Sequence, residues 1–275
     1  MFSTYYWFAG RRRPENHCCL NLALYGPRKH WAMTERGEGD LARTADTLAI
    51  GPSSMAWEDG RLVLDVDERS TPFPRLERPY PMRGRIVLDV EAPGSERHYL
   101  DHARRHEWQP LAPSARVRVE MAEPALSWSG HAYLDTNAGT EPLEAGFRRW
   151  DWSRTRFSDG ASAILYDRTL ADGRRVATAR RIDRTGRAEP FEPPERRALP
   201  RGSWFLDRHT QAEAAPRLVQ SFEDAPFYTR AAIETTLCGE RAPAVHETLD
   251  CRRLSNFIVR GMLNMRIPRR PGSGL

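Results

Sequence analysis

Lysine is almost absent from this 275-residue chain, which has Lys29 as its single lysine and carries the rest of its positive charge on arginine. The chain has 42 basic and 37 acidic residues, for a formal net charge of +5. Its arginines are scattered among Asp and Glu, and no zinc-finger, RRM or helix-turn-helix pattern accompanies them. We therefore expect no nucleic-acid partner.

Sequence patterns for bound cofactors are also missing. The four cysteines fit no metal-ligand or CxxC spacing, and no Gly-rich phosphate loop is present. His98, His102 and His106 would align on a helix as zinc ligands, but their segment has no apolar helical stripe and runs into Pro110. We expect neither a metal nor an organic cofactor.

Long hydrophobic runs are the third absence. No apolar stretch approaches the roughly 20 residues of a membrane-spanning helix, and the N-terminal segment lacks the uninterrupted apolar core of a signal peptide. A cytoplasmic location is therefore expected. Two arginine-rich runs, "GRRRP" at 10–14 and "RIPRRP" at 266–271, favour loose attraction to an anionic membrane surface. A solvated turn and a frayed tail would explain them equally well.

Short strands separated by turns dominate what is present, and the pattern predicts an all-β protein. Expected strands cover 60–68, 83–92, 115–121, 217–222, 229–237 and 243–251. Residues 161–183 contain Asp-Gly between two apolar runs and predict a hairpin. The Pro-rich segment 187–202 cannot form a central strand. The chain length suits two β units joined near residues 138–150.

The stretch "WSGHAYLDTN", residues 128–137, has an unusual polar face. With a period of two, Ser129, His131, Tyr133, Asp135 and Asn137 share one side of a strand. That side has no Lys, Arg or Glu, unlike the charged face of "ARVRVEM" at 115–121. Short polar groups of this kind suit an enclosed lumen, although a solvated sheet face remains an alternative.

Aromatic pairs two residues apart occur in two other segments. His106 and Trp108 share one face, as do Trp150 and Trp152. Tryptophan at this density predicts an aromatic-walled cavity, with a Trp-rich core as the alternative.

Several motifs, in order, resemble the carotenoid 1,2-hydratase (hydroxyneurosporene synthase) family. They are "PENHCCLNLALYG", "HWAMTERG", "IGPSSMAWEDGRLVLDVDE", "HEWQPLAPSARVRVEM", "WSGHAYLDTNAGTEPLE", "RRWDWSR" and "ILYD". The resemblance runs from about residue 5 to residue 170 and weakens after the Pro-rich segment. Cys19 and Thr140 depart from the usual pattern, and Thr140 argues against a second carboxylate at that position.

The resemblance implies two lipocalin-like antiparallel β-barrel domains, which we place at residues 1–140 and 141–275. It also implies a hydratase without a cofactor that acts on an acyclic carotene such as neurosporene or lycopene. The family's acid maps onto Asp135, with Tyr133, His106 and Trp108 in support.

Protonation of an isolated alkene needs a carboxylic acid that stays neutral near pH 7, which an apolar lumen favours. Asp135 at the inward end of the polar face meets this need. Tyr133 and Trp108 would stabilise the resulting carbocation with their rings, and His106 or His131 would accept the proton of the incoming water.

The remaining candidates are substrate-binding residues. They are His131, Trp128, Asn137, Trp150 and Trp152. Partners are then the carotene, water and the inner or photosynthetic membrane, on which the protein would lie peripherally. A non-catalytic lipid carrier and a cofactor-free isomerase or cyclase on the same scaffold are the competing hypotheses.

Overall fold

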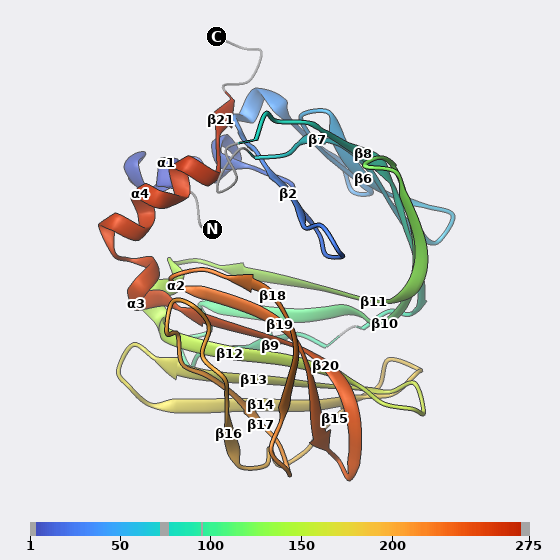
Figure 1. Cartoon of the computed structure of the whole chain (residues 1–275), viewed down its shortest axis with the longest axis vertical. Helices are drawn as coiled ribbons and strands as arrows, with labels where there is room; N and C mark the ends of the chain where they lie inside the picture. Colours follow the sequence, from blue (N-terminus) through green and yellow to red (C-terminus); the bar gives the residue numbers. More distant parts are fainter. Residues whose placement is uncertain (1–3, 72–76, 95, 271–275) are drawn as a thin grey trace. The chain divides into compact units, whose positions relative to one another are not determined.

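The computed structural model describes residues 4–71, 77–94 and 96–270, and strands predominate in them (Figure 1). The chain forms two compact units, each made of segments that are separate in sequence. The terminal unit contains the described residues of 2–90, 115–132 and 260–275, and the central unit those of 91–114 and 133–259. The all-β class expected from the sequence is confirmed.

The first large sheet has the strand order β11-β10-β8-β7-β6-β5-β4, and the short β9 pairs with β10. Its strands are β4 (Leu41–Arg43), β5 (Thr47–Ile50), β6 (Ser53–Glu58), β7 (Arg61–Arg69), β8 (Pro81–Ala92), β9 (His98–Tyr99), β10 (His106–Glu123) and β11 (Leu126–Gly139). Asp59 and Gly60 connect β6 to β7 with positive φ angles of 49° and 77°, as a tight two-residue hairpin requires. Strands β10 and β11 contribute residues to both units.

Short elements complete the terminal unit. They are α1 (Thr4–Phe8), η1 (Pro14–His17), β1 (Asn21–Leu24), β2 (His30–Met33), β3 (Glu35–Arg36), η2 (Glu38–Asp40), most of α4 (Phe257–Arg266) and β21 (Arg269–Arg270). Strand β21 pairs in parallel with β3, so that Arg269 and Arg270 lie beside Glu35 and Arg36. Beside this pair, Arg36 donates two hydrogen bonds of 2.9 Å to the buried carboxylate of Glu68.

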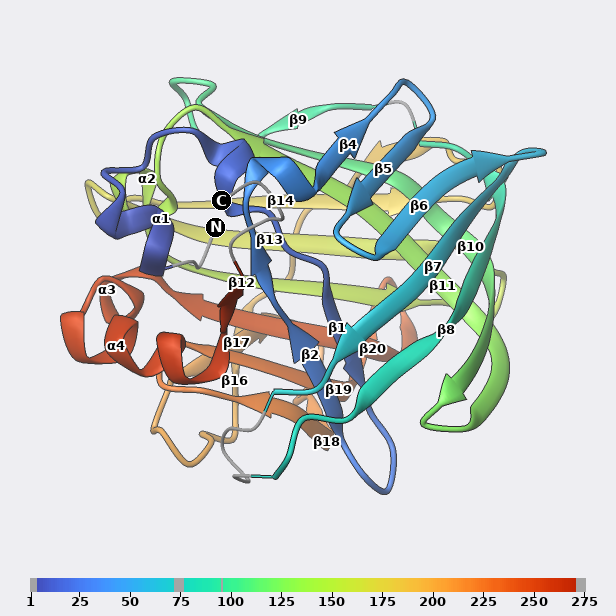
Figure 2. The same cartoon turned by 90° about the horizontal axis from the view of Figure 1, so that it is seen from above.

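The central unit is built on an antiparallel sheet with the order β15-β14-β13-β12-β20-β19-β18 (Figure 2). Its strands are β12 (Phe147–Arg156), β13 (Ser162–Leu170), β14 (Arg175–Ile182), β15 (Ala188–Pro190), β18 (Arg217–Asp224), β19 (Tyr228–Leu237) and β20 (Glu240–Asp250). Strands β16 (Arg196–Leu199) and β17 (Arg208–Gln211) form a separate hairpin, and α2 (Leu143–Gly146) and α3 (Cys251–Leu254) flank β12 and β20 in the chain.

The hairpin expected at 161–183 is confirmed as β13 and β14, with Gly173 at a φ of 94° in the turn. The Pro-rich segment provides β15, which is an end strand of its sheet, and β16. Its prolines therefore occupy no central strand, in agreement with the sequence.

Side chains of β12 alternate between two different environments. Asp151 faces the hairpin of β16 and β17, where it is buried and accepts hydrogen bonds from Thr248 (2.5 Å), Arg149 (3.0 Å) and Arg196 (3.1 Å). The contact between Arg196 and Asp151 thus links β16 to β12 through a buried carboxylate. Trp150 and Trp152 point to the opposite face, where the candidate site lies.

Neither large sheet closes into a barrel among the described residues, because β11 and β4 end the first sheet and β15 and β18 end the second. The predicted pair of barrels is therefore not confirmed. None of the helices in the described ranges combines the length and hydropathy that a membrane crossing requires.

Candidate active site

Asp135 lies in the central unit at the centre of a three-residue hydrogen-bond cluster. Its Oδ2 atom accepts a hydrogen bond of 2.8 Å from the indole N–H of Trp108 and one of 3.0 Å from the hydroxyl of Tyr133. The indole N–H also lies 3.2 Å from the Tyr133 oxygen. Tyr133 and Asp135 share a face because they are two apart on β11, and β10 brings Trp108 to them from the neighbouring strand.

The environment of Asp135 favours its neutral form. Burial raises the pKa of its carboxyl, and the negative charge of Glu247 raises that pKa further. The hydrogen bonds from Trp108 and Tyr133 and the charge of Arg230 act in the opposite direction, yet the net shift is upward. A carboxyl group in this state can hold a proton and deliver it.

Tyr133 acts as a neutral donor to Asp135. Burial raises the pKa of its hydroxyl, and the charge of Asp135 raises it further, so the phenol keeps its proton. Because Oδ2 of Asp135 already accepts two donors, a proton on this carboxyl belongs on the other oxygen, Oδ1. The acidic O–H group is thereby assigned to one oxygen.

Aromatic rings surround the cluster within the central unit. The ring of Tyr133 lies 5.5 Å from that of Trp152, and Trp108 lies 5.9 Å from Tyr166. Trp150 is 6.0 Å from Tyr166. Trp150 and Trp152, selected from the sequence, therefore belong to the same aromatic group as the cluster, and Trp108 is fully buried.

Sequence reasoning missed Tyr166, although it lies in the "ILYD" motif. In the sheet, Tyr166 on β13 is paired with Trp152 on β12, and its pKa is raised by burial and by the charges of Asp135 and Glu247. The only available signal was the position of Tyr166 on a strand that follows the two tryptophans. Which of its neighbours it would face depends on strand register, which sequence patterns do not give.

A charged pair was also missed. Glu247 on β20 is directly paired with Trp152 on β12 and with Arg230 on β19. Arg230 donates a hydrogen bond of 2.7 Å from Nε to Oε1 of Glu247, and its Nη2 atom forms an ion pair with the same oxygen at 2.5 Å. The charge of Glu247 raises the pKa of Asp135 and that of Tyr166, so it acts on the carboxyl group and on the aromatic group around it.

His106 is held in place from several sides. The Oδ2 atom of Asp101 accepts a hydrogen bond of 2.8 Å from the backbone N–H of His106 and lies 3.0 Å from the Nδ1 atom of the same histidine. With Nδ1–H donating to Asp101, Nε2 is the basic nitrogen, and this buried atom has no hydrogen-bond partner among the described residues. A Cβ atom at Gly146 would lie 2.6 Å from His106 Cε1, so only glycine fits there without moving the ring.

No hydrogen bond in the described part of the chain joins His106 to Asp135. The ring of His106 instead lies 4.7 Å from that of Phe147. On the adjacent strand β9, His98 stacks on Trp108 at 4.9 Å with an angle of 26° between the rings. His98 thus covers one face of Trp108, and the helix that would align His98, His102 and His106 does not form.

Three of the predicted binding residues lie toward the solvent. The side chain of Trp128 is 49% exposed, and His131 and Asn137 are also exposed. His131 lies 3.1 Å from a guanidinium nitrogen of Arg116, in the terminal unit. Only the middle of the polar face on β11 is therefore enclosed, and a role for these three residues in binding stays a prediction.

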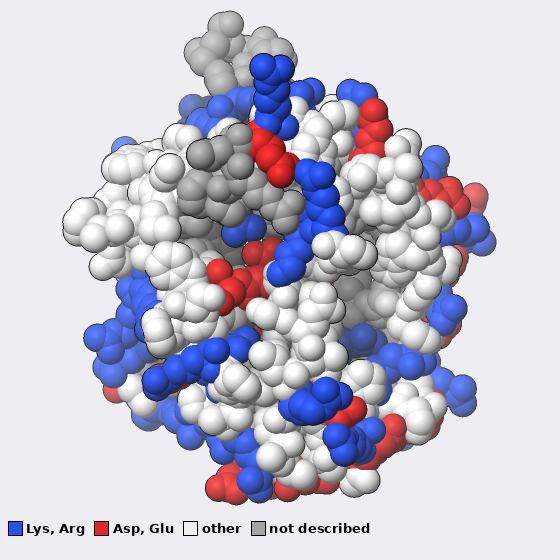
Figure 3. Space-filling view, in the orientation of Figure 1, with Lys and Arg blue, Asp and Glu red and all other residues white. Residues whose placement is uncertain are grey.

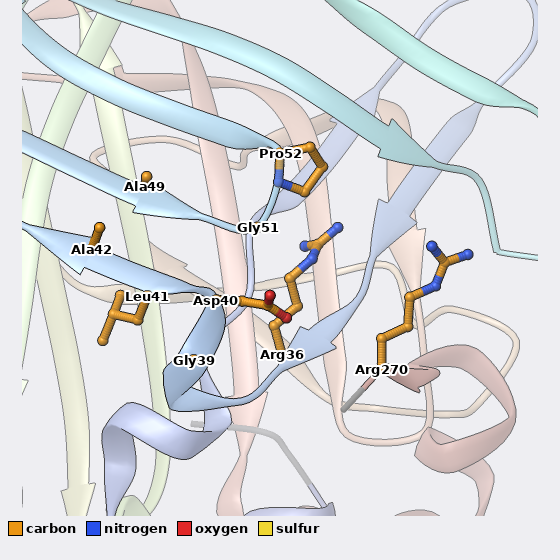
Figure 4. A pocket seen from close by; sticks show the side chains of 9 residues that line it. All are labelled: Arg36, Gly39, Asp40, Leu41, Ala42, Ala49, Gly51, Pro52 and Arg270. Atoms are coloured by element: carbon orange, nitrogen blue, oxygen red, sulfur yellow. The ribbon is translucent and has the colours of Figure 1, made fainter. Parts of the chain in front are cut away.

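A pocket of about 460 Å³ lies elsewhere, in the terminal unit (Figure 4). Its lining includes Arg36, Asp40, Leu41 and Arg270 and none of the residues selected from the sequence. Two arginines and one aspartate share this lining with small apolar residues. Within the described ranges, no cluster of three or more His, Cys, Asp or Glu side chains could hold a metal ion.

Comparisons with known proteins identify the family of the chain. The family model described as carotenoid hydratase CrtC matches residues 1–275. The chain is 43% identical over 274 residues to the acyclic carotenoid 1,2-hydratase of Cereibacter sphaeroides, which covers 99% of this chain and 96% of that protein. The protein of the same name from Thiocapsa roseopersicina is 45% identical over 276 residues, covering 98% of this chain and 67% of the relative.

Among solved structures, a crystal structure of a putative AttH from Nitrosomonas europaea aligns with a TM-score of 0.58. The identity is 14%, and the alignment covers 84% of this chain and 80% of that chain, so this likeness concerns the fold alone. The family resemblance noted in the sequence is confirmed by the family model and the curated relatives. The chain belongs to the carotenoid hydratase CrtC family.

Proposed function

We propose that this protein adds water to the terminal C1=C2 double bond of an acyclic carotene such as neurosporene or lycopene. Family membership supports the reaction class. The observation that carries the mechanism is Asp135, a carboxyl group with a raised pKa that is oriented by Trp108 and Tyr133.

The first step is protonation of the alkene. The O–H bond of neutral Asp135 breaks, its proton forms a new C–H bond at C2, and C1 becomes a tertiary carbocation. Alkenes are very weak bases, so the acid must be neutral at the working pH and correctly placed. Trp108 and Tyr133 bind the oxygen that does not donate, which leaves Oδ1 to act as the acid.

The carbocation is then stabilised by aromatic faces and by a fixed negative charge. Each desolvated face contributes about 0.5–2 kcal/mol, and Tyr133, Trp150, Trp152 and Tyr166 are the candidates. Trp108 has one face covered by His98 and acts mainly as a hydrogen-bond donor to the acid. The carboxylate of Glu247 adds electrostatic stabilisation.

Water captures C1 in the last step. As the C–O bond forms, the water must lose a proton, and the unpaired Nε2 of His106 is the proposed acceptor. His131 is the alternative base. The proton then returns through solvent to Asp135, which restores the acid, so the overall reaction consumes one alkene and one water.

The wider setting follows from the same proposal. We infer two lipocalin-like barrel domains, at residues 1–140 and 141–275, and a peripheral association with the inner or photosynthetic membrane that holds the carotene. No metal or organic cofactor enters the proposed steps. Trp128, His131 and Asn137, together with Trp150 and Trp152, remain proposed substrate-binding residues.

The test is product analysis with the variant Asp135→Asn. The amide can occupy the same volume, accept the hydrogen bonds of Trp108 and Tyr133, and place N–H in the position of the acidic O–H, but it cannot protonate carbon. Wild-type protein with lycopene in liposomes should yield products heavier by one or two waters, detected by chromatography with mass detection. Asp135→Asn should bind lycopene and yield none. The control Asp89→Asn, at a half-exposed carboxylate of the terminal unit that pairs with Arg61, should behave as wild type.

The same assay separates the competing functions. An isomer of equal mass indicates an isomerase or cyclase, and lycopene binding with no product by the wild-type protein indicates a carrier. Hydration by Asp135→Asn at the wild-type rate would exclude Asp135 as the acid.

A further inference from the structure

Helix α4 has its polarity reversed relative to an ordinary surface helix. Arg260 is only 9% exposed, whereas Phe257 and Ile258 are 77% and 59% exposed and Met265 is 57% exposed. Exposed Gly261 lies between them on the same face, since residues i, i+4 and i+8 align along a helix. Three large apolar side chains of α4 therefore point outward while Arg260 points inward.

A second helix holds this arrangement in place. Within the terminal unit, the Thr4 hydroxyl of α1 donates a hydrogen bond of 2.8 Å to the backbone oxygen of Arg260. The guanidinium of Arg260 lies over the ring of Trp7, 4.7 Å from its centroid. Trp7 and the neighbouring Phe8 are themselves 42% and 69% exposed. Figure 1 shows α1 beside α4, and the surface over α4 in Figure 3 shows neither acidic nor basic side chains.

Arginines follow both helices directly in the chain. Residues 11–13 come after α1, and Arg266, Arg269 and Arg270 come at and after the end of α4. Some of this charge is neutralised, since Arg13 pairs with Glu38 and Arg269 with Glu35. Arg12 and Arg270 are exposed. The two runs noted in the sequence thus border the apolar surface.

We propose that α1 and α4 form the surface by which this protein docks on an anionic lipid bilayer. An interfacial helix has an apolar face for the acyl boundary and basic residues beside it for the headgroups. Aromatic residues such as Trp7 are favoured at that depth. A second copy of the chain is a poorer occupant, because two identical arginine borders would repel each other whereas anionic lipid attracts them. The inference rests on the proposed function in one respect, since a carotene substrate would be dissolved in the lipid on which the protein docks.

The experiment measures vesicle binding directly. The variant Phe8→Ser with Ile258→Ser removes one aromatic and one branched aliphatic side chain from the docking surface. Its control, Trp57→Ser with Val219→Ser, removes an equivalent pair, 45% and 53% exposed, from β6 and β18. Binding is measured by flotation with vesicles of phosphatidylcholine containing 30% phosphatidylglycerol, on the full-length chain, with circular dichroism to confirm folding.

The docking variant should bind these vesicles at least tenfold more weakly than wild type, because two large apolar side chains no longer enter the lipid. The control should bind as wild type. Vesicles of phosphatidylcholine alone, or 0.5 M salt, should weaken wild-type binding. Hydration of lycopene should fall for the docking variant in liposomes but not in detergent.

Equal vesicle binding by wild type and the docking variant would overturn the proposal, as would an equal loss in the control. A wild-type dimer in sedimentation that the docking variant converts to a monomer would assign the surface to a second copy instead. Failure of the proposed function is distinguished by the detergent assay, since absence of hydrated product there leaves the vesicle measurement valid.

Discussion

Replacing Tyr133 with phenylalanine should move the pH dependence of hydration toward higher pH. Asp135 must be protonated to act, so the rate falls as the pH rises through its pKa. In the wild-type protein, burial raises that pKa and the hydrogen bond from Tyr133 partly opposes the rise. Tyr133→Phe keeps the ring against Trp152 and removes only the opposing hydrogen bond. The pKa of Asp135 therefore rises further.

The size of the shift follows from the geometry at Oδ2. A hydrogen bond to a charged group contributes about 1.5–3 kcal/mol. The neutral acid would also accept one at Oδ2, so roughly half of that value distinguishes the two protonation states. One pKa unit corresponds to about 1.4 kcal/mol. The alkaline limb should therefore move up by about half a unit to one unit.

The variant should also fold, because the indole N–H of Trp108 keeps Oδ2 of Asp135 as its acceptor at 2.8 Å. The assay is the initial rate of lycopene hydration in liposomes across the pH range in which the protein stays folded. Tyr99→Phe, at an exposed tyrosine of the central unit, is the matched control. An alkaline limb that stays in place or moves to lower pH would refute the assignment of Asp135 as the titrating acid.

Substitutions at three further positions test other contacts of the structure. Trp108→Phe should shift the same alkaline limb upward, whereas Trp108→Ala should lower the free energy of unfolding by about 3–5 kcal/mol in denaturant titration. Asp151→Asn should lower the free energy of unfolding by about 3–5 kcal/mol, because it removes the buried charge that pairs with Arg149 and Arg196, which are themselves half-buried. Burial acts to raise the pKa of Asp151, but Arg149 more than offsets this and the pKa lies below its ordinary value of 3.8. The stabilisation is therefore present above pH 3.8 and disappears as the pH falls through the lowered pKa. Gly146→Ala should reduce kcat at least tenfold, because the added methyl group would displace the His106 ring. In a double-mutant cycle, its effect should be non-additive with that of His106→Ala. Additive effects would mean that the two positions act independently.

The part of the site that lies on one strand could be predicted from the sequence. Alternation with a period of two places Tyr133 and Asp135 on a common face, and the same rule places Trp150 beside Trp152. The contributions of Tyr166 and Glu247 could not be predicted in this way. They reach the site through the register of β13 and β20 against β12, which depends on pairing between distant segments.

The length of β11 explains why only part of its predicted polar face is enclosed. This strand has 14 residues and spans about 46 Å at roughly 3.3 Å per residue, far more than the depth of one core. Its middle therefore packs around Asp135 while His131 and Asn137 lie exposed.

The outward apolar face of helix α4 could not be predicted for a different reason. Its sequence shows an apolar stripe, and such a stripe ordinarily predicts a face turned toward the core.

The binding of both donors to a single carboxyl oxygen has a stereochemical consequence. With Oδ2 engaged by Trp108 and Tyr133, the proton leaves from Oδ1 along one fixed direction, so it reaches only one face of the planar alkene. In heavy water, C2 of the product becomes a chiral CHD centre, and every turnover should give it the same handedness. The handedness of a single isotopic label would then report how the acid is oriented during catalysis.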